Sequence, residues 1–172
     1  MPIWVYDVTE TEIRSRDPNT AFGNSFLITV EHSDDGTDVT QGLVKFDLSA
    51  IAIVGDLPDL LSVAWARLEL LTTTSTTHPW EKVGSPISGH AMLAAWNESS
   101  TWNSFGGDGV QPDGVEAAAE ASFEIVDPDG GSVAISDVTA DVRRWLAGDA
   151  PNEGWVLSLT QNPEWDFTTA ES

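Results

Sequence analysis

The segment that most constrains the fold is Gly42–Ile51, which reads GLVKFDLSAI. Successive side chains of an extended chain point to opposite faces, so one face of this segment carries Val44, Phe46 and Leu48. The opposite face carries the charged side chain of Lys45. This alternation predicts a half-buried strand, and we expect that strand to lie at the centre of the sheet.

Other segments with alternating or strongly apolar character predict further strands, separated by clusters of Gly, Pro, Asn and Asp that are typical of turns. The predicted strands are Ile3–Val8, Glu10–Arg16, Phe26–Glu31, Val63–Thr72, Gly89–Trp96, Glu120–Val126, Val133–Ile135 and Gly154–Thr160. Near the end of the chain, Pro163–Phe167 is expected to be a turn.

Two hairpins and one helix follow from the turn signals. The polar stretch 32–41 predicts a hairpin between Phe26–Glu31 and Leu43–Leu48 of the central strand. The sequence DPDGG predicts a second hairpin, between Glu120–Val126 and Val133–Ile135. Asp137–Leu146 has apolar residues at helical spacing, so it predicts a short helix that Ser136 or Asp137 caps. Together, about nine short strands and one helix predict an all-β fold, a two-sheet antiparallel β-sandwich or jelly roll, with residues 1–172 as a single domain.

The charge of the chain restricts its partners. It has 28 acidic and 7 basic residues, for a net charge of −21. Nucleic acid and anionic membrane surfaces attract clustered Lys and Arg, so neither is an expected partner. The acidic surface is either a solvated coat, as in proteins from salty water, or a coat that contains divalent-cation sites. No apolar run spans a bilayer and no signal peptide is evident, so the chain is either cytosolic or a piece of a longer secreted protein.

A catalytic function is not expected. The chain has no Cys, and His32, His78 and His90 do not have the spacing of a zinc-binding motif. No nucleophile elbow or phosphate-binding loop is present in the sequence. Carboxylate pairs mean little in a chain with 28 acidic residues. We therefore predict that the protein is not an enzyme.

A set of motifs in a fixed order resembles a known family. The chain contains Asp7, then IRSRDPNTAFGNSFLITV, GLVKFDLSAI, VAWARLELL, WNESSTWN, SDVTADVRRWLAG and NEGWVLSL. This order is similar to that of the DNRLRE domain, which includes carbohydrate-binding module family 96, and the resemblance covers nearly the whole chain. It implies a jelly roll that is secreted or on the cell surface and is covalently linked to other domains, such as polysaccharide-degrading enzymes.

The resemblance also implies a function. Some family members bind alginate, which implies a non-catalytic carbohydrate-binding module for an acidic or marine polysaccharide. The alternative is a spacer or adhesion module of a surface protein, with no glycan site. Two features depart from the family: a final strand of the form R-P-x-L-x-V does not follow WDFTTAES, and a surface at −21 repels a polyanion unless basic residues cluster or calcium bridges the carboxylates.

Aromatic and basic side chains are the candidates for ligand binding. Sugar rings pack their C–H faces on aromatic rings, and Trp80 and Trp165 lie in polar surroundings that favour exposure. The basic residues Arg14, Arg16, Lys45 and Arg67 form an anionic-sugar patch if they share a face, and otherwise pair with nearby Asp and Glu. The other tryptophans are expected to be structural, either in the core or pinning a loop: Trp4, Trp65, Trp145, Trp155, Trp96 and Trp102.

Oxygen-rich turns are candidates for a structural calcium ion, because calcium prefers carboxylate and carbonyl oxygens. Asp17 and Asn19 lie in a turn, and Asp137 either reaches that site or caps the helix. Two other acidic clusters are open alternatives, at residues 34–38 and 127–129.

Overall fold

The computed structural model describes residues 5, 7–33, 35–49, 51, 63–72, 86–126, 133–160 and 164–168, and for residues 164, 165 and 168 it describes only the backbone. This part of the chain is mostly β-structure with a short α-helix, which confirms the predicted all-β class. None of the helices in these ranges is long and apolar enough to cross a membrane.

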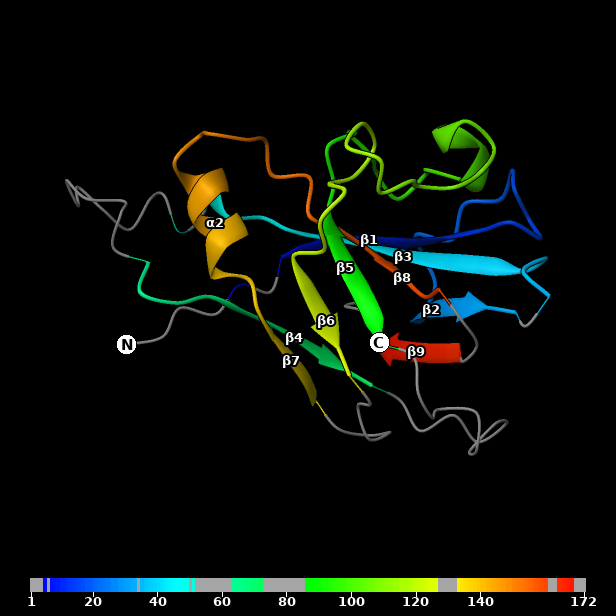
Figure 1. Cartoon of the computed structure of the whole chain (residues 1–172), viewed down its shortest axis with the longest axis horizontal. Helices are drawn as coiled ribbons and strands as arrows, with labels where there is room; N and C mark the ends of the chain where they lie inside the picture. Colours follow the sequence, from blue (N-terminus) through cyan, green and yellow to red (C-terminus); the bar gives the residue numbers. More distant parts are fainter. Residues whose placement is uncertain are drawn as a thin grey trace.

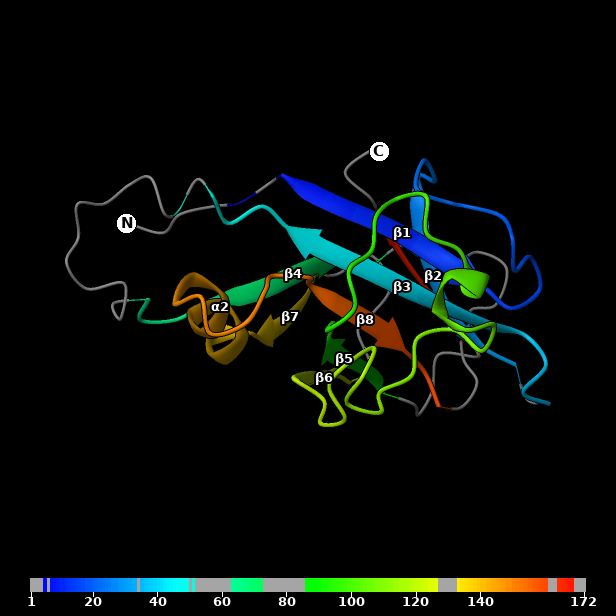
Figure 2. The same cartoon turned by 90° about the horizontal axis from the view of Figure 1, so that it is seen from above.

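The larger layer is a seven-stranded antiparallel sheet, which we call sheet A. Its strands are hydrogen-bonded in the order β6 (Phe123–Ile125), β5 (Ile87–Ala91), β8 (Trp155–Ser158), β3 (Val39–Phe46), β2 (Leu27–His32) and β9 (Glu164–Thr168), and β1 (Val8–Arg14) pairs with the other edge of β3. Figure 2 shows β1, β3 and β8 side by side, with β3 in the middle.

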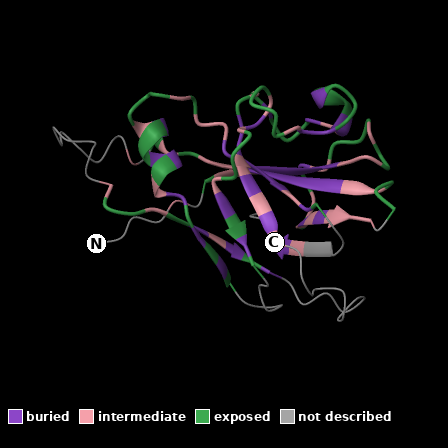
Figure 3. Cartoon of the chain, in the orientation of Figure 1, coloured by how far each residue is buried: buried purple, intermediate pink, exposed green. Residues whose placement is uncertain are grey.

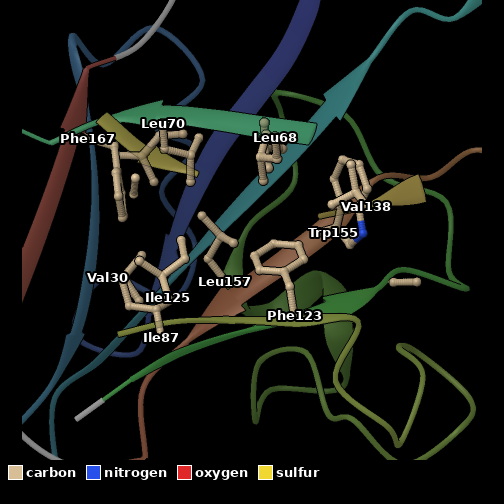
Figure 4. Close-up of a cluster of buried hydrophobic side chains, with 14 of the residues drawn as sticks. Val30, Leu68, Leu70, Ile87, Phe123, Ile125, Val138, Trp155, Leu157 and Phe167 are labelled. Atoms are coloured by element: carbon tan, nitrogen blue, oxygen red, sulfur yellow. The ribbon is translucent and has the colours of Figure 1, made fainter. Parts of the chain in front are cut away.

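The smaller layer, sheet B, consists of β4 (Arg67–Leu71) and β7 (Val133–Asp137), which pair antiparallel. It lies across one face of sheet A (Figure 1). An isolated bridge between Thr72 and Phe167 joins the end of β4 to β9, so sheet A curls round to meet sheet B. Figure 4 shows the apolar core that the two sheets enclose, with Leu68 and Leu70 of β4 facing side chains of sheet A. The fold is therefore sandwich-like.

Strand β3 is buried on both faces, not half-buried as its alternation predicts (Figure 3). Val44 is 1% exposed and belongs to the core between the sheets, whereas Leu43 is 0% exposed and belongs to a second apolar cluster. That second cluster is formed with the long segment 92–117 and contains, among others, Met92, Trp96, Trp102, Phe105, Val110 and Ala117. The expected structural roles of Trp96 and Trp102 are thus confirmed.

The segment that covers β3 is attached to it by a buried amide. The side chain of Gln41 donates to the carbonyl of Val110 and accepts from the Val110 N–H, both at 2.9 Å. These two reciprocal bonds satisfy two donors and two acceptors that are otherwise cut off from water. They explain why a segment with little regular structure beyond the 3₁₀ helix η2 (Trp102–Phe105) follows the sheet closely.

Strands β2 and β3 form a hairpin as predicted, but the pairing does not include Leu43–Leu48. Strands β2 and β3 pair only at Glu31–Thr40 and His32–Val39, after which β2 pairs with β9. Strand β2 passes over the face of β3 at Gly42, where an added Cβ would lie 2.6 Å from Ile28 Cγ2. The absence of a side chain at Gly42 allows β2 and β3 to approach each other at this point.

Two other predictions are wrong. Strands β6 and β7 do not form a hairpin, because β6 pairs with β5 in sheet A and β7 pairs with β4 in sheet B. The segment 163–167, expected to be a turn, contributes to β9, which buries Phe167 in the core. In both cases the partner strand is distant in the sequence, so local turn signals are a poor guide.

The predicted helix is present as α2 (Thr139–Leu146). Trp145 on α2 is buried and its ring lies 4.7 Å from that of Trp155, centroid to centroid, so both tryptophans are structural as expected. The N-cap position is Val138, and Asp137, one of the two predicted caps, lies immediately before it and accepts the Thr139 N–H at 2.9 Å through its carboxylate. Hydrogen bonds from Thr139 lower the pKa of Asp137.

The close approach at Gly42 can be tested by adding one methyl group. Gly42→Ala should lower the free energy of unfolding by about 1–3 kcal/mol, because the new Cβ overpacks against β2. Urea denaturation measures this loss. The double variant Gly42→Ala/Ile28→Ala should lose less unfolding free energy than the two single variants lose together, because Ile28 is the side chain that the new methyl group would contact. An unchanged unfolding free energy in Gly42→Ala contradicts the interpretation.

Candidate functional site

The four basic residues predicted to form a ligand-binding patch do not share one face. Arg14 and Arg16 lie at or after the end of β1, Lys45 lies on β3, and Arg67 lies in sheet B. Each forms an ion pair, which is the alternative that the sequence left open. The pairs are Arg14–Glu12, Arg16–Asp38, Lys45–Glu153 and Arg67–Glu69.

Arg14 has a structural role in this arrangement. Its partner Glu12 is fully buried on β1 and also accepts the backbone N–H of Thr29 on β2 at 2.6 Å. The Nε of Arg14 donates to Glu12 at 2.8 Å, and its guanidinium lies 4.2 Å from the ring centroid of Phe22. A buried carboxylate needs such a partner, so Arg14 supports the contact between β1 and β2.

Lys45 also holds part of the fold together. Its Nζ lies 3.2 Å from Glu153 and 5.2 Å from the ring centroid of Trp96. The indole of Trp96 donates to the carbonyl of Glu153 at 2.7 Å, so one cation, one ring and one carboxylate connect three segments. By contrast, the Arg16–Asp38 pair is exposed, and pairs of that kind contribute little to stability.

The predicted calcium ligands are not brought together. Asp17 and Asn19 lie in the turn after β1, where the Asn19 side chain accepts a hydrogen bond from Asn103 at 2.8 Å. Asp137 lies at the start of α2, at the opposite end of the molecule (Figures 1 and 2). Within the described ranges, no group of three or more His, Asp and Glu residues has the geometry to hold a metal ion. The calcium site stays a prediction.

The alternative acidic clusters can be placed only in part. Asp127 and Asp129 lie outside the described residues. Asp35, in the turn between β2 and β3, accepts hydrogen bonds from the side chain and N–H of Thr37 and from Ser33. These bonds, the one from the Thr37 hydroxyl above all, lower the pKa of Asp35 to about 2. Hydrogen bonds within the turn therefore account for the lowered pKa of Asp35, and a bound cation is not needed to explain it.

The aromatic candidates have different outcomes. Trp80 lies outside the described residues, and for Trp165 only the backbone is described, in β9 opposite Val30. The expectation that Trp65 is a core residue is wrong, because its side chain is 57% exposed. A signal for this was present in the sequence: Trp65 alternates in register with Arg67 and Glu69, which marks its face as the solvent face.

Trp65 belongs to a continuous exposed surface, which we call the outer face of sheet B. It is formed by Trp65, Arg67, Glu69 and Leu71 together with Val133, Ile135 and Asp137. At one end the Arg67 guanidinium lies 5.3 Å from the ring centroid of Trp65, and Asp137 is the direct cross-strand partner of Arg67. The opposite end is aliphatic. An exposed surface with an aromatic ring, a guanidinium and carboxylates can bind a ligand that has both C–H faces and hydroxyl groups.

The structural role of Arg14 leads to an unequal pair of stability losses. Arg14→Gln should lower the unfolding free energy by about 3–5 kcal/mol, because the fully buried carboxylate of Glu12 loses its cation. Glu12→Gln should cost less, since the amide oxygen still accepts the Thr29 N–H and the partly exposed guanidinium remains hydrated. Chemical denaturation of both variants gives the order, and a larger loss in Glu12→Gln contradicts this assignment.

Comparison with known proteins adds no further constraint: neither a family model nor a curated protein matches this sequence. The resemblance to the DNRLRE domain and the functions that it implies therefore stay predictions, and the functional argument depends on the geometry of the chain itself.

Proposed function

We propose that this chain is a non-catalytic polysaccharide-binding module, and that the outer face of sheet B is its binding surface. The observation that carries this proposal is the exposed indole of Trp65 beside Arg67, with Asp137 opposite Arg67 across the sheet. An exposed tryptophan next to charged hydrogen-bonding groups favours a glycan site over a spacer, because sugar rings stack on aromatic faces while polar groups bind their hydroxyls.

Each part of the surface has a chemical role in this proposal. The C–H face of a sugar ring packs on the Trp65 indole, as apolar groups pack on aromatic rings elsewhere. The guanidinium of Arg67 donates to ring or hydroxyl oxygens, and the carboxylates of Glu69 and Asp137 accept from hydroxyl groups. A two-stranded sheet presents these groups in a row along its strands, which fits a polymer better than a small ligand.

The resemblance supports a wider context. In this proposal the sandwich is a jelly roll of the DNRLRE type, secreted or on the cell surface, and covalently attached to a polysaccharide-degrading or surface protein. An acidic polysaccharide such as alginate is the ligand that the resemblance favours. The charge of the chain opposes it, because Arg67 is already paired with Glu69 and the net charge is −21. Neutral polysaccharides should therefore be retained at least as well as alginate at low ionic strength.

A spacer or adhesion module is the second candidate, and one observation favours it. Leu71, Val133 and Ile135 are 49%, 48% and 57% exposed, and they form the aliphatic end of the outer face of sheet B. Exposed aliphatic side chains in a group are typical of surfaces that contact other proteins. In that case the surface packs against a neighbouring domain and no polysaccharide is retained.

Trp65→Ala tests the proposal. If the indole is the stacking surface, this variant should weaken polysaccharide binding by about tenfold or more, which corresponds to about 1.4 kcal/mol of lost stacking. Affinity electrophoresis against a panel of alginate and neutral polysaccharides, with calcium and then with a chelator, provides the measurement.

Phe26→Ala is the matched control, because Phe26 is an aromatic residue that is 69% exposed outside sheet B. It should leave binding unchanged. Equal losses in both variants, or binding that Trp65→Ala does not affect, would exclude the outer face of sheet B as the site. If the folded wild-type chain is not retained by any polymer of the panel, the spacer function replaces the proposal.

A further inference from the structure

A second surface with binding chemistry lies where β3 extends beyond its neighbour β8. Strand β8 pairs with β3 only from Gly42 to Val44. Past that point the edge of β3 is met by the side chain of Asn152, whose amide donates to the carbonyl of Phe46 at 2.8 Å. The space between this part of β3, the start of β1 and helix α2 is a groove of about 610 Å³, which we call the β3–α2 groove.

The polar lining of the groove combines two acidic residues with one basic residue and the uncharged side chains of Thr9, Ser49 and Asn152. Asp7 and Asp47 contribute carboxylates, and Lys45 is the cation among the described lining residues. Lys45 is already paired with Glu153, so its charge is largely compensated. The carboxylate of Asp47 accepts the N–H and the hydroxyl of Ser49 at 2.8 and 2.9 Å, which lowers its pKa and keeps it ionised.

The remaining lining is apolar, with one unsatisfied donor. Phe46 and Leu48 lie on the β3 side, and Trp145 and Leu146 come from α2. The indole N–H of Trp145 is buried and has no hydrogen-bond acceptor in the described part of the chain. A buried donor without an acceptor is uncommon, because it loses its bond to water and gains nothing in return.

Helix α2 connects the groove to the outer face of sheet B. Its Arg143 donates to the carbonyls of Val63 and Ala64, at 2.8 and 3.1 Å, immediately before Trp65. Two residues further along the helix, Trp145 lines the groove. The two surfaces are therefore adjacent to the same short helix.

We propose that the β3–α2 groove is a second sugar subsite, which accepts an uncharged or amine-bearing sugar ring and rejects a uronate. This inference rests on the proposed polysaccharide-binding function. Carboxylates of Asp7 and Asp47 accept hydrogen bonds from sugar hydroxyl groups and attract a protonated amine, whereas they repel a carboxylate at the same distance. The apolar side chains pack against the C–H face of the ring.

The test is a charge series of ligands. Isothermal titration calorimetry at low salt is done with three β-1,4-linked hexasaccharides, made of glucose, glucosamine or glucuronate units. The wild-type chain should bind the glucosamine oligomer most tightly and the glucuronate oligomer at least about tenfold more weakly, a difference that screening by salt should reduce.

The double variant Asp7→Asn/Asp47→Asn should reduce the preference for glucosamine over glucuronate to about threefold or less, because the groove loses its two carboxylates. Glu120→Gln/Glu124→Gln is the matched control: both residues are exposed and do not line the groove, and the net charge changes by the same amount. The control should keep the wild-type preference. A second readout is the Trp145 indole N–H resonance, which should shift on titration with the glucosamine oligomer.

The two proposals fail in different ways. One outcome removes only the groove. Oligosaccharides bind and Trp65→Ala weakens their binding, but the Asp7→Asn/Asp47→Asn variant keeps the wild-type preference for glucosamine over glucuronate and the Trp145 resonance does not move. In that case the groove is not a subsite and the proposed function stands. An equal loss of preference in the Glu120→Gln/Glu124→Gln control also overturns the subsite, because it assigns the effect to net charge. If no oligosaccharide binds the folded wild-type chain, both proposals are wrong.

Discussion

The fold depends on the burial of one strand, β3, on both of its faces. Val44 faces the core between the two sheets and Leu43 faces the cluster under the segment 92–117. A strand that is covered on both sides can expose its polar backbone only at its edges, so it requires neighbouring strands there. Strand β1 satisfies one edge, and β2 and β8 share the other. The remaining elements cover the two faces that this arrangement creates.

The two proposed binding surfaces lie where this covering ends. The outer face of sheet B is the solvent side of the smaller layer, since no described segment packs against it. The β3–α2 groove opens where β3 continues past β8 and only Asn152 meets its edge. Both surfaces place apolar side chains beside carboxylates, which is the combination that recognises polyhydroxylated ligands.

Electrostatics distinguish among such ligands. The chain has a net charge of −21. The basic residues Arg14, Lys45 and Arg67 are each paired with a carboxylate of the chain itself. Arg14 compensates the buried Glu12, and Lys45 joins Trp96 to Glu153, so these cations contribute to stability before they can contribute to binding. Under the proposed function, neutral and cationic glycans are therefore better matched to this surface than polyanions, which is the opposite of what the resemblance to the DNRLRE domain implies.

Periodicity in the sequence determined the local structure. Alternation predicted the strands now seen as β2 and β8 and the core positions Trp155 and Leu157, and helical spacing predicted α2 with Asp137 at its start. These features depend on which side chains neighbour each other along the chain, so a single segment contains enough information to predict them. The same alternation placed Trp65 with Arg67 and Glu69, and thus contained the signal for its exposure.

Only the tertiary structure decided which strands pair and what covers them. The sequence did not show that β6 and β7 belong to different sheets, that the segment 163–167 contributes to β9, or that Leu43 is buried beneath a distant segment. Nor did it place Lys45 and Trp145 at one groove. These outcomes depend on contacts between residues far apart in the sequence, whose free energy comes from shared burial of apolar surface, and no local pattern encodes the partner.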